Sequence, residues 1–146
     1  MPRIERTAEI VWEGNLARGR GAITAGTGAF SSLPFSLPSR VGDPGGKTSP
    51  EELLAAAHGG CLTMSLAGEL TQAGTPPTRL DVTCRIVMDE VEGEGHQIVA
   101  SHMTIGVDAD GADEAAIAAA IERADAECPF STLLGKAGVV VEISRR

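Results

Sequence analysis

Aromatic side chains are scarce in this chain, which has one Trp, three Phe and no Tyr among 146 residues. Proteins that bind single-stranded nucleic acid stack bases on such rings, so this class is disfavoured. Basic residues are also few, with 12 Lys and Arg against 20 Asp and Glu and a formal net charge of −8. An acidic surface repels phosphate backbones and anionic lipids. We therefore expect neither a nucleic-acid partner nor a membrane partner.

Segments that would direct the chain out of the cytoplasm are missing as well. No run of residues has the apolar length of a membrane span, and the first residues lack the apolar core of a signal peptide. The sequence predicts a cytoplasmic protein, in which thiols stay reduced. Cysteines number three, an odd count that argues against a secreted disulfide scaffold. No Cys-x-x-Cys occurs and the three His are scattered, so we expect no metal and no cofactor.

Length and composition predict one folded domain over residues 1–146, because 42% of the residues are apolar. Pattern and turn residues predict strands and helices in a mixed order, which indicates an α+β fold rather than repeated βαβ units. Pro34 and Pro38 make the third strand an edge or irregular one. The expected strands are 4–13, 19–26, 30–39, 79–91, 96–107 and 138–143, and the expected helices are 50–73, 113–127 and a short turn at 130–134.

The helix expected over 50–73 has clear start and stop signals. Ser49 can cap it, Pro50 fits a first turn, and Gly74 follows its end. Nearly every residue from 55 to 67 is small or apolar, which predicts a helix buried almost all round at the centre of the molecule. The Gly59-Gly60 pair lowers helix propensity by roughly 1 kcal/mol per residue, a loss that is often tolerated where another backbone must approach closely.

Two cysteines are the candidate functional residues. Cys61 lies within the expected long helix, and Cys128 precedes Pro129 at the start of another helical turn. A thiol beside a helix terminus or a cation becomes a reactive thiolate, and two such thiols suffice to reduce a peroxide and to form a disulfide. Two buried core cysteines fit the local sequence equally well, and the residues alone leave both interpretations open. Cys84 lies in an expected strand and should be inert.

Several motifs together resemble the OsmC/Ohr family, the osmotically inducible and organic-hydroperoxide-resistance proteins. They extend over essentially the whole chain and comprise Trp12-Glu13-Gly14, the run from Arg18 to Gly21, the run from Thr48 to Cys61, and Cys128-Pro129. Ser39-Arg40 and the N-terminal match favour the OsmC branch. The resemblance implies antiparallel sheets wrapped around long central helices in an intertwined homodimer. It also implies a cysteine-based peroxidase without metal or haem.

The resemblance assigns roles to residues. Cys61 would be the peroxidatic cysteine and Cys128 the resolving one. Arg40 would stabilise the Cys61 thiolate, with Glu51 holding the guanidinium. The Ohr branch takes its arginine from the earlier region, so Arg18 and Arg20 compete with Arg40. The expected contacts for the organic tail of the peroxide are Phe35, Leu37, Leu54, Met64 and Phe130.

The activity implied is the reduction of organic hydroperoxides, and more weakly of hydrogen peroxide, in oxidative or osmotic stress. A dithiol reductant, either a lipoylated protein or a thioredoxin-like protein, would regenerate the thiols. One alternative is a non-catalytic dimer of the same fold that binds a small hydrophobic or thiol ligand. A more distant alternative is a cysteine hydrolase using His58, but no acid or amide that would orient this imidazole is evident in the sequence.

Overall fold

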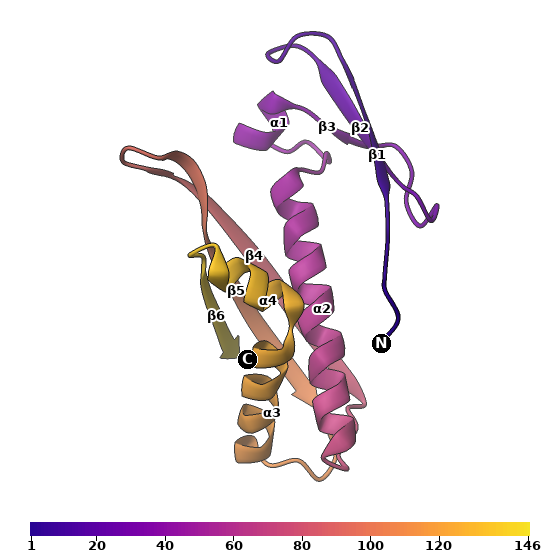
Figure 1. Ribbon diagram of the computed structural model, residues 1–146, viewed down its shortest axis with the longest axis vertical. Coiled ribbons are helices and arrows are strands. Elements are labelled where there is room, and N and C mark those ends of the chain that lie inside the picture. Colours follow the sequence, from indigo (N-terminus) through magenta and orange to yellow (C-terminus); the bar gives the residue numbers. More distant parts are fainter. The chain divides into compact units, whose positions relative to one another are not determined.

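The computed structural model describes residues 1–146. Two compact units are present, Met1–Pro50 and Glu51–Arg146, and Figure 1 traces their elements along the chain. The expectation of a single domain over the whole chain stays a prediction. None of the helices combines the length and the apolar character that crossing a membrane would require.

The N-terminal unit is a small antiparallel sheet followed by one helical turn. Its strands pair in the order β1-β2-β3, and the turn α1 follows directly. The bounds are β1 Ala8–Glu13, β2 Arg20–Ala25, β3 Leu33–Phe35 and α1 Leu37–Val41. The predicted strand over 30–39 is thus wrong beyond Phe35. The Ser36 hydroxyl accepts from the Ser39 N–H as an N-cap, and a proline fits the first turn of a helix.

Two aromatic rings organise this small sheet. Trp12 on β1 and Phe35 on β3 lie with ring centroids 5.6 Å apart, and the Trp12 indole N–H donates to the Gly14 carbonyl at 2.9 Å. Gly19 and Gly21 make room for the rings, because a Cβ at either position would collide with Trp12 or Phe35 respectively. The scarce aromatics of the chain therefore fix the N-terminal sheet.

The C-terminal unit contains the second sheet, with strand order β4-β5-β6. β4 Arg79–Val91 and β5 Gly95–Asp108 are antiparallel, whereas β6 Val140–Arg145 runs parallel to β5. The α+β class is confirmed, but this one pairing departs from the expected antiparallel arrangement. The reason is the connection: α3 Glu114–Glu127 and α4 Pro129–Lys136 lie between β5 and β6, and a crossover through helices allows parallel pairing.

The long helix α2 spans Pro50–Gln72 and ends ahead of Gly74, whose φ of +81° suits glycine. The expectation of all-round burial is wrong. Its buried positions form one stripe, and Met64 is 73% exposed. Cys61, beside that stripe, also packs against the core. The core consists of Leu62, Leu66, Leu70, Met103, Ile105, Ala120, Ala124 and Cys128.

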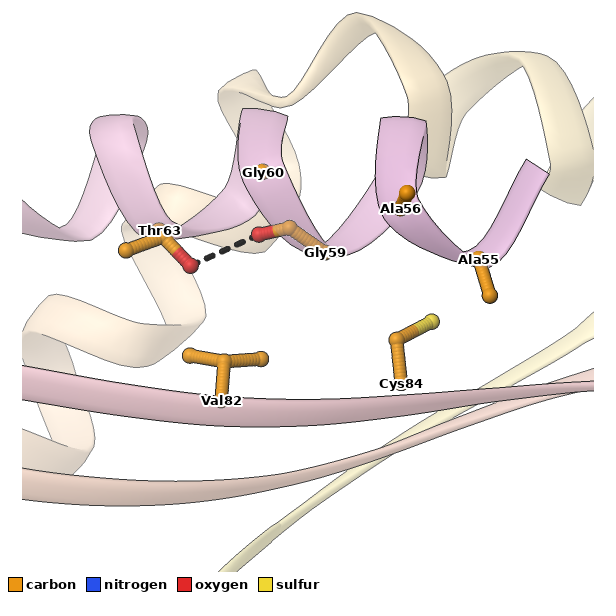
Figure 2. Close-up of a pocket in the computed structure, with 7 residues that line it drawn as sticks. All are labelled: Ala55, Ala56, Gly59, Gly60, Thr63, Val82 and Cys84. Atoms are coloured by element: carbon orange, nitrogen blue, oxygen red, sulfur yellow. Dashed lines mark hydrogen bonds between the residues drawn. The ribbon is translucent and has the colours of Figure 1, made fainter. Parts of the chain in front are cut away.

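Gly59 and Gly60 have different surroundings, as Figure 2 shows. A Cβ built on Gly59 would lie 3.1 Å from the Cβ of Cys84 on β4 and 3.9 Å from a methyl group of Val82. A Cβ on Gly60 would meet nothing within 4 Å. Only Gly59 is required for the close packing of α2 on β4.

This difference predicts unequal effects of the same substitution. Gly59→Val should lower the free energy of unfolding by about 1–3 kcal/mol, because the branched side chain overpacks the contact between α2 and β4. Gly60→Val, the matched control, should stay within about 0.5 kcal/mol of the wild type. Urea unfolding of both variants measures the difference, and equal losses would contradict the packing described here.

Candidate functional site

Folding brings Cys61 and Cys128 into contact. Cys61 is half-buried on α2, and Cys128 is fully buried at the junction where α3 ends and α4 begins. The Cys128 side chain lies close enough to influence the Cys61 thiol, and both cysteines are free. Two cysteines that are far apart in the sequence therefore form one dithiol site inside the C-terminal unit.

The N-terminus of α4 is directed at this site. Cys128 is the N-cap residue of α4 but makes no side-chain cap hydrogen bond, and Pro129 at the start has no N–H. The first free donor is Phe130, whose backbone N–H lowers the pKa of the Cys61 thiol. The first N–H groups of a helix have no partner within the helix and carry partial positive charge. Negative charge on the Cys61 sulfur is therefore favoured by this helix end.

The net electrostatic balance at Cys61 nevertheless favours the thiol. Burial raises the pKa of Cys61, and the hydrogen bond and charge of Cys128 raise it further. The Phe130 N–H lowers the pKa of Cys61, but by less than burial and Cys128 raise it. A reactive thiolate normally has a cation nearby, so the chemistry of this pair still requires a positive charge.

His58, one helical turn before Cys61, is the centre of a buried polar network. Its side chain is fully buried, with Nδ1 2.8 Å from Ser101 Oγ on β5 and Nε2 2.8 Å from Ser131 Oγ on α4. Burial lowers the pKa of His58, and the Asp125 carboxylate opposes this only in part. The imidazole is therefore neutral at neutral pH, donating from one ring nitrogen and accepting at the other.

This network was not found from the sequence. The serines have no local motif, and they meet His58 only through the tertiary fold. The acid that seemed missing near His58 is Asp125, which comes from α3. The hydrolase alternative is disfavoured, because both ring nitrogens bond serine hydroxyls rather than the Cys61 sulfur.

Cys84 is separate from the dithiol pair. Its sulfur lies 3.5 Å from Ser101 Oγ, and it lines an open cavity of about 290 Å³ between α2 and β4. The lining is made of small side chains and does not include Cys61 or Cys128 (Figure 2). Cys84 therefore has surroundings different from those of the proposed catalytic thiols.

Three of the predicted site residues share a cavity within the N-terminal unit. Arg40, in the last turn of α1, lines a space of about 70 Å³ together with Phe35 and Leu37. Sequence reasoning missed four further lining residues, namely Trp12, Leu16, Ser36 and Pro50. Trp12 also packs against Phe35 in the sheet. The cavity combines apolar walls with one guanidinium.

The competing arginines lie elsewhere in the same unit. Arg20 forms an ion pair with Glu13 at 3.1 Å across the β1–β2 pairing, and the backbone N–H of Arg18 donates to the Asn15 side chain. The choice of Arg40 as the arginine that would stabilise the Cys61 thiolate stays a prediction.

The remaining predicted residues lie on α2 and α4. Glu51 is in the first turn of α2, and Leu54 is half-buried two turns before Cys61. Met64 is exposed on the same helix, whereas Phe130 packs against the core cluster, as Cys61 does. The structure thus brings Phe130 together with Cys61, while the tail-binding role of all these side chains is untested.

Comparisons with known proteins agree on one family. Residues 42–144 match the family model OsmC, described as OsmC-like protein. The chain is 33% identical over 132 residues to "Peroxiredoxin OsmC" of Escherichia coli strain K12, covering 90% of each chain. Shigella flexneri has a curated relative with the same name and identity.

Solved structures give the same fold. An organic hydroperoxide resistance protein OsmC from Legionella pneumophila superposes with a TM-score of 0.76 at 19% identity, covering 98% of each chain. The organic hydroperoxide resistance protein OhrB of Bacillus subtilis gives a TM-score of 0.74 at 20% identity, covering 96% of this chain and 98% of that one. These two likenesses establish the fold, and the family model and curated relative establish descent: the chain belongs to the OsmC family.

Proposed function

We propose that this protein is a thiol-dependent peroxidase that reduces organic hydroperoxides, and more weakly hydrogen peroxide, to alcohols or water. The observation that carries the proposal is the neighbouring pair of free thiols, Cys61 and Cys128, at the N-terminus of α4. Support also comes from the 33% identical relative named a peroxiredoxin, which favours a peroxiredoxin-like redox protein.

The chemistry proceeds in two steps. The Cys61 thiolate attacks the terminal peroxide oxygen, the O–O bond breaks, and the alkoxide takes up a proton and leaves as the alcohol. Cys61 is then a sulfenic acid. The Cys128 thiolate attacks the Cys61 sulfur, hydroxide leaves and is protonated to water, and a disulfide forms. The proximity of the two side chains supports this step, because both thiols belong to the same packed cluster.

Arg40 is proposed as the cation that this chemistry requires. A guanidinium stays charged at all relevant pH values and donates several hydrogen bonds, so it can stabilise a thiolate and orient peroxide oxygens. Glu51 would hold the guanidinium in place. The likeness of Ser39-Arg40 and of the run from Thr48 to Cys61 to the family pattern supports this assignment. The arginine would come from the same chain or from a partner subunit.

The wider setting of the enzyme follows from the family. The organic tail would lie on Phe35, Leu37, Leu54, Met64 and Phe130. We propose an intertwined homodimer, a dithiol reductant such as a lipoylated or thioredoxin-like protein, and a role in stress defence in the cytoplasm. The exposed stripe of α2, which includes Ala56, Gly60 and Met64, supports a dimer, because small and apolar residues there are otherwise left facing solvent.

The alternative is a non-catalytic member of the fold that binds a small hydrophobic or thiol ligand. The raised pKa of Cys61 is the observation in its favour, since a protonated thiol does not attack peroxides efficiently. The two functions differ in what a single cysteine substitution does to peroxide turnover.

Cysteine variants decide between them. Cys61→Ser should abolish turnover of cumene hydroperoxide with a dithiol reductant, because no sulfenic acid can form. Cys128→Ser should lower turnover at least about tenfold, leaving unresolved sulfenic acid that dimedone traps. Cys84→Ser is the matched control and should stay within about twofold of the wild type. Steady-state alcohol production measures all three, and retained turnover in Cys61→Ser would exclude the peroxidase.

The arginine assignment has its own test in a Cys84→Ser/Cys128→Ser background, where Cys61 is the single thiol. Arg40→Met should raise the apparent pKa of Cys61 and slow its alkylation by iodoacetamide at pH 7 by about tenfold or more. Arg18→Met and Arg20→Met are the controls and should leave the pH profile unchanged. A shift seen with Arg20→Met but not with Arg40→Met would move the role to the earlier position.

A further inference from the structure

Two side-chain contacts join α2 to α4, and they are one helical turn apart on both helices. The first is the packing of Cys61 against the core cluster that contains Cys128. The second is the bond of 2.8 Å between His58 Nε2 and Ser131 Oγ. His58 precedes Cys61 by three residues, and Ser131 follows Cys128 by three, so each helix presents both members on neighbouring positions. The contact between His58 and Ser131, which does not react, therefore lies next to the pair of thiols that would react.

We propose that His58 is a positioning residue for disulfide formation. Through Ser131 it holds the first turn of α4 against α2, so that Cys128 and the Phe130 N–H face the Cys61 sulfur. This inference rests on the proposed function and deepens it, because it assigns a role to a residue that takes no part in the peroxide chemistry itself.

The first turn of α4 needs such an anchor. Its N-cap residue, Cys128, makes no side-chain cap hydrogen bond. The other ring nitrogen of His58, Nδ1, lies 2.8 Å from Ser101 Oγ on β5, on the side away from α4. The imidazole is fully buried, and an unpaired ring nitrogen there would lose the full stabilisation of a buried hydrogen bond. The bond to Ser131 is therefore maintained in the reduced protein.

Accurate placement affects the fate of the sulfenic acid, which has two competing reactions. Attack by the Cys128 thiol gives the disulfide and one water. Attack by the Cys61 sulfenate on a second hydroperoxide gives the sulfinic acid and one alcohol, a loss that is irreversible without a dedicated repair enzyme. A disulfide requires Cβ atoms about 3.5–4.5 Å apart, so loosening α4 slows the first reaction without slowing the second.

The test measures this partition in single-turnover reactions with excess cumene hydroperoxide. All proteins carry Cys84→Ser, and mass spectrometry quantifies the disulfide and the Cys61 sulfinic acid. Ser131→Ala should lower the ratio of disulfide to sulfinic acid by about tenfold. Ser101→Ala, which removes a buried hydroxyl of the same network on the side away from α4, should leave the ratio within about threefold of the reference.

Thermal unfolding of both serine variants measures their loss of stability. The ratio of disulfide to sulfinic acid is insensitive to a modest loss of folded protein, so a change in this ratio reports on positioning. An unchanged ratio in Ser131→Ala, or an equal fall in both variants, would overturn the positioning role while leaving the peroxidase intact. Absence of any disulfide in the reference protein itself would overturn the proposed function and this inference together.

Discussion

The contact between the Cys61 sulfur and the first turn of α4 is the interaction on which the rest of the site depends. It requires α3 to end where Cys128 is fully buried, and Pro129 to start a new helix there. It also requires α2 to lie close to the second sheet, which Gly59 allows. A helix N-terminus and a second thiol thus lie beside one sulfur, and a buried imidazole holds the same helix one turn away. Each of these parts is an ordinary structural feature, and their joint placement is what makes a dithiol reaction feasible.

Electrostatics explain why the C-terminal unit alone does not complete the proposed enzyme. Burial and the nearby Cys128 raise the pKa of Cys61, and one helix N–H offsets this only in part. A protonated thiol in this setting is protected from unselective oxidation, whereas a guanidinium would convert it to the reactive form. In the N-terminal unit, a cavity beside Arg40 has mostly apolar walls.

Local signals predicted much of the fold. Pro50 and Gly74 bracketed α2 to within one residue, and the helix expected over 113–127 begins at Glu114, with Asp113 as its N-cap. One error was local, because the Ser36 cap and Pro38 start a helical turn where a strand was expected. Two errors came from tertiary context: β6 is parallel because two helices precede it, and the fully buried positions of α2 form only one stripe. Motif likeness identified the cysteine pair, but it did not indicate Ser101 or Ser131, since these meet His58 only after folding.

The most direct test of the central claim is to treat the reduced protein with one equivalent of cumene hydroperoxide and map its thiols by intact and peptide mass spectrometry. The account predicts rapid loss of two hydrogen atoms and a disulfide between Cys61 and Cys128, with Cys84 left as a free thiol. Unchanged thiols, or slow oxidation spread over all three cysteines, would contradict it and favour a binding protein that has kept the fold of the family.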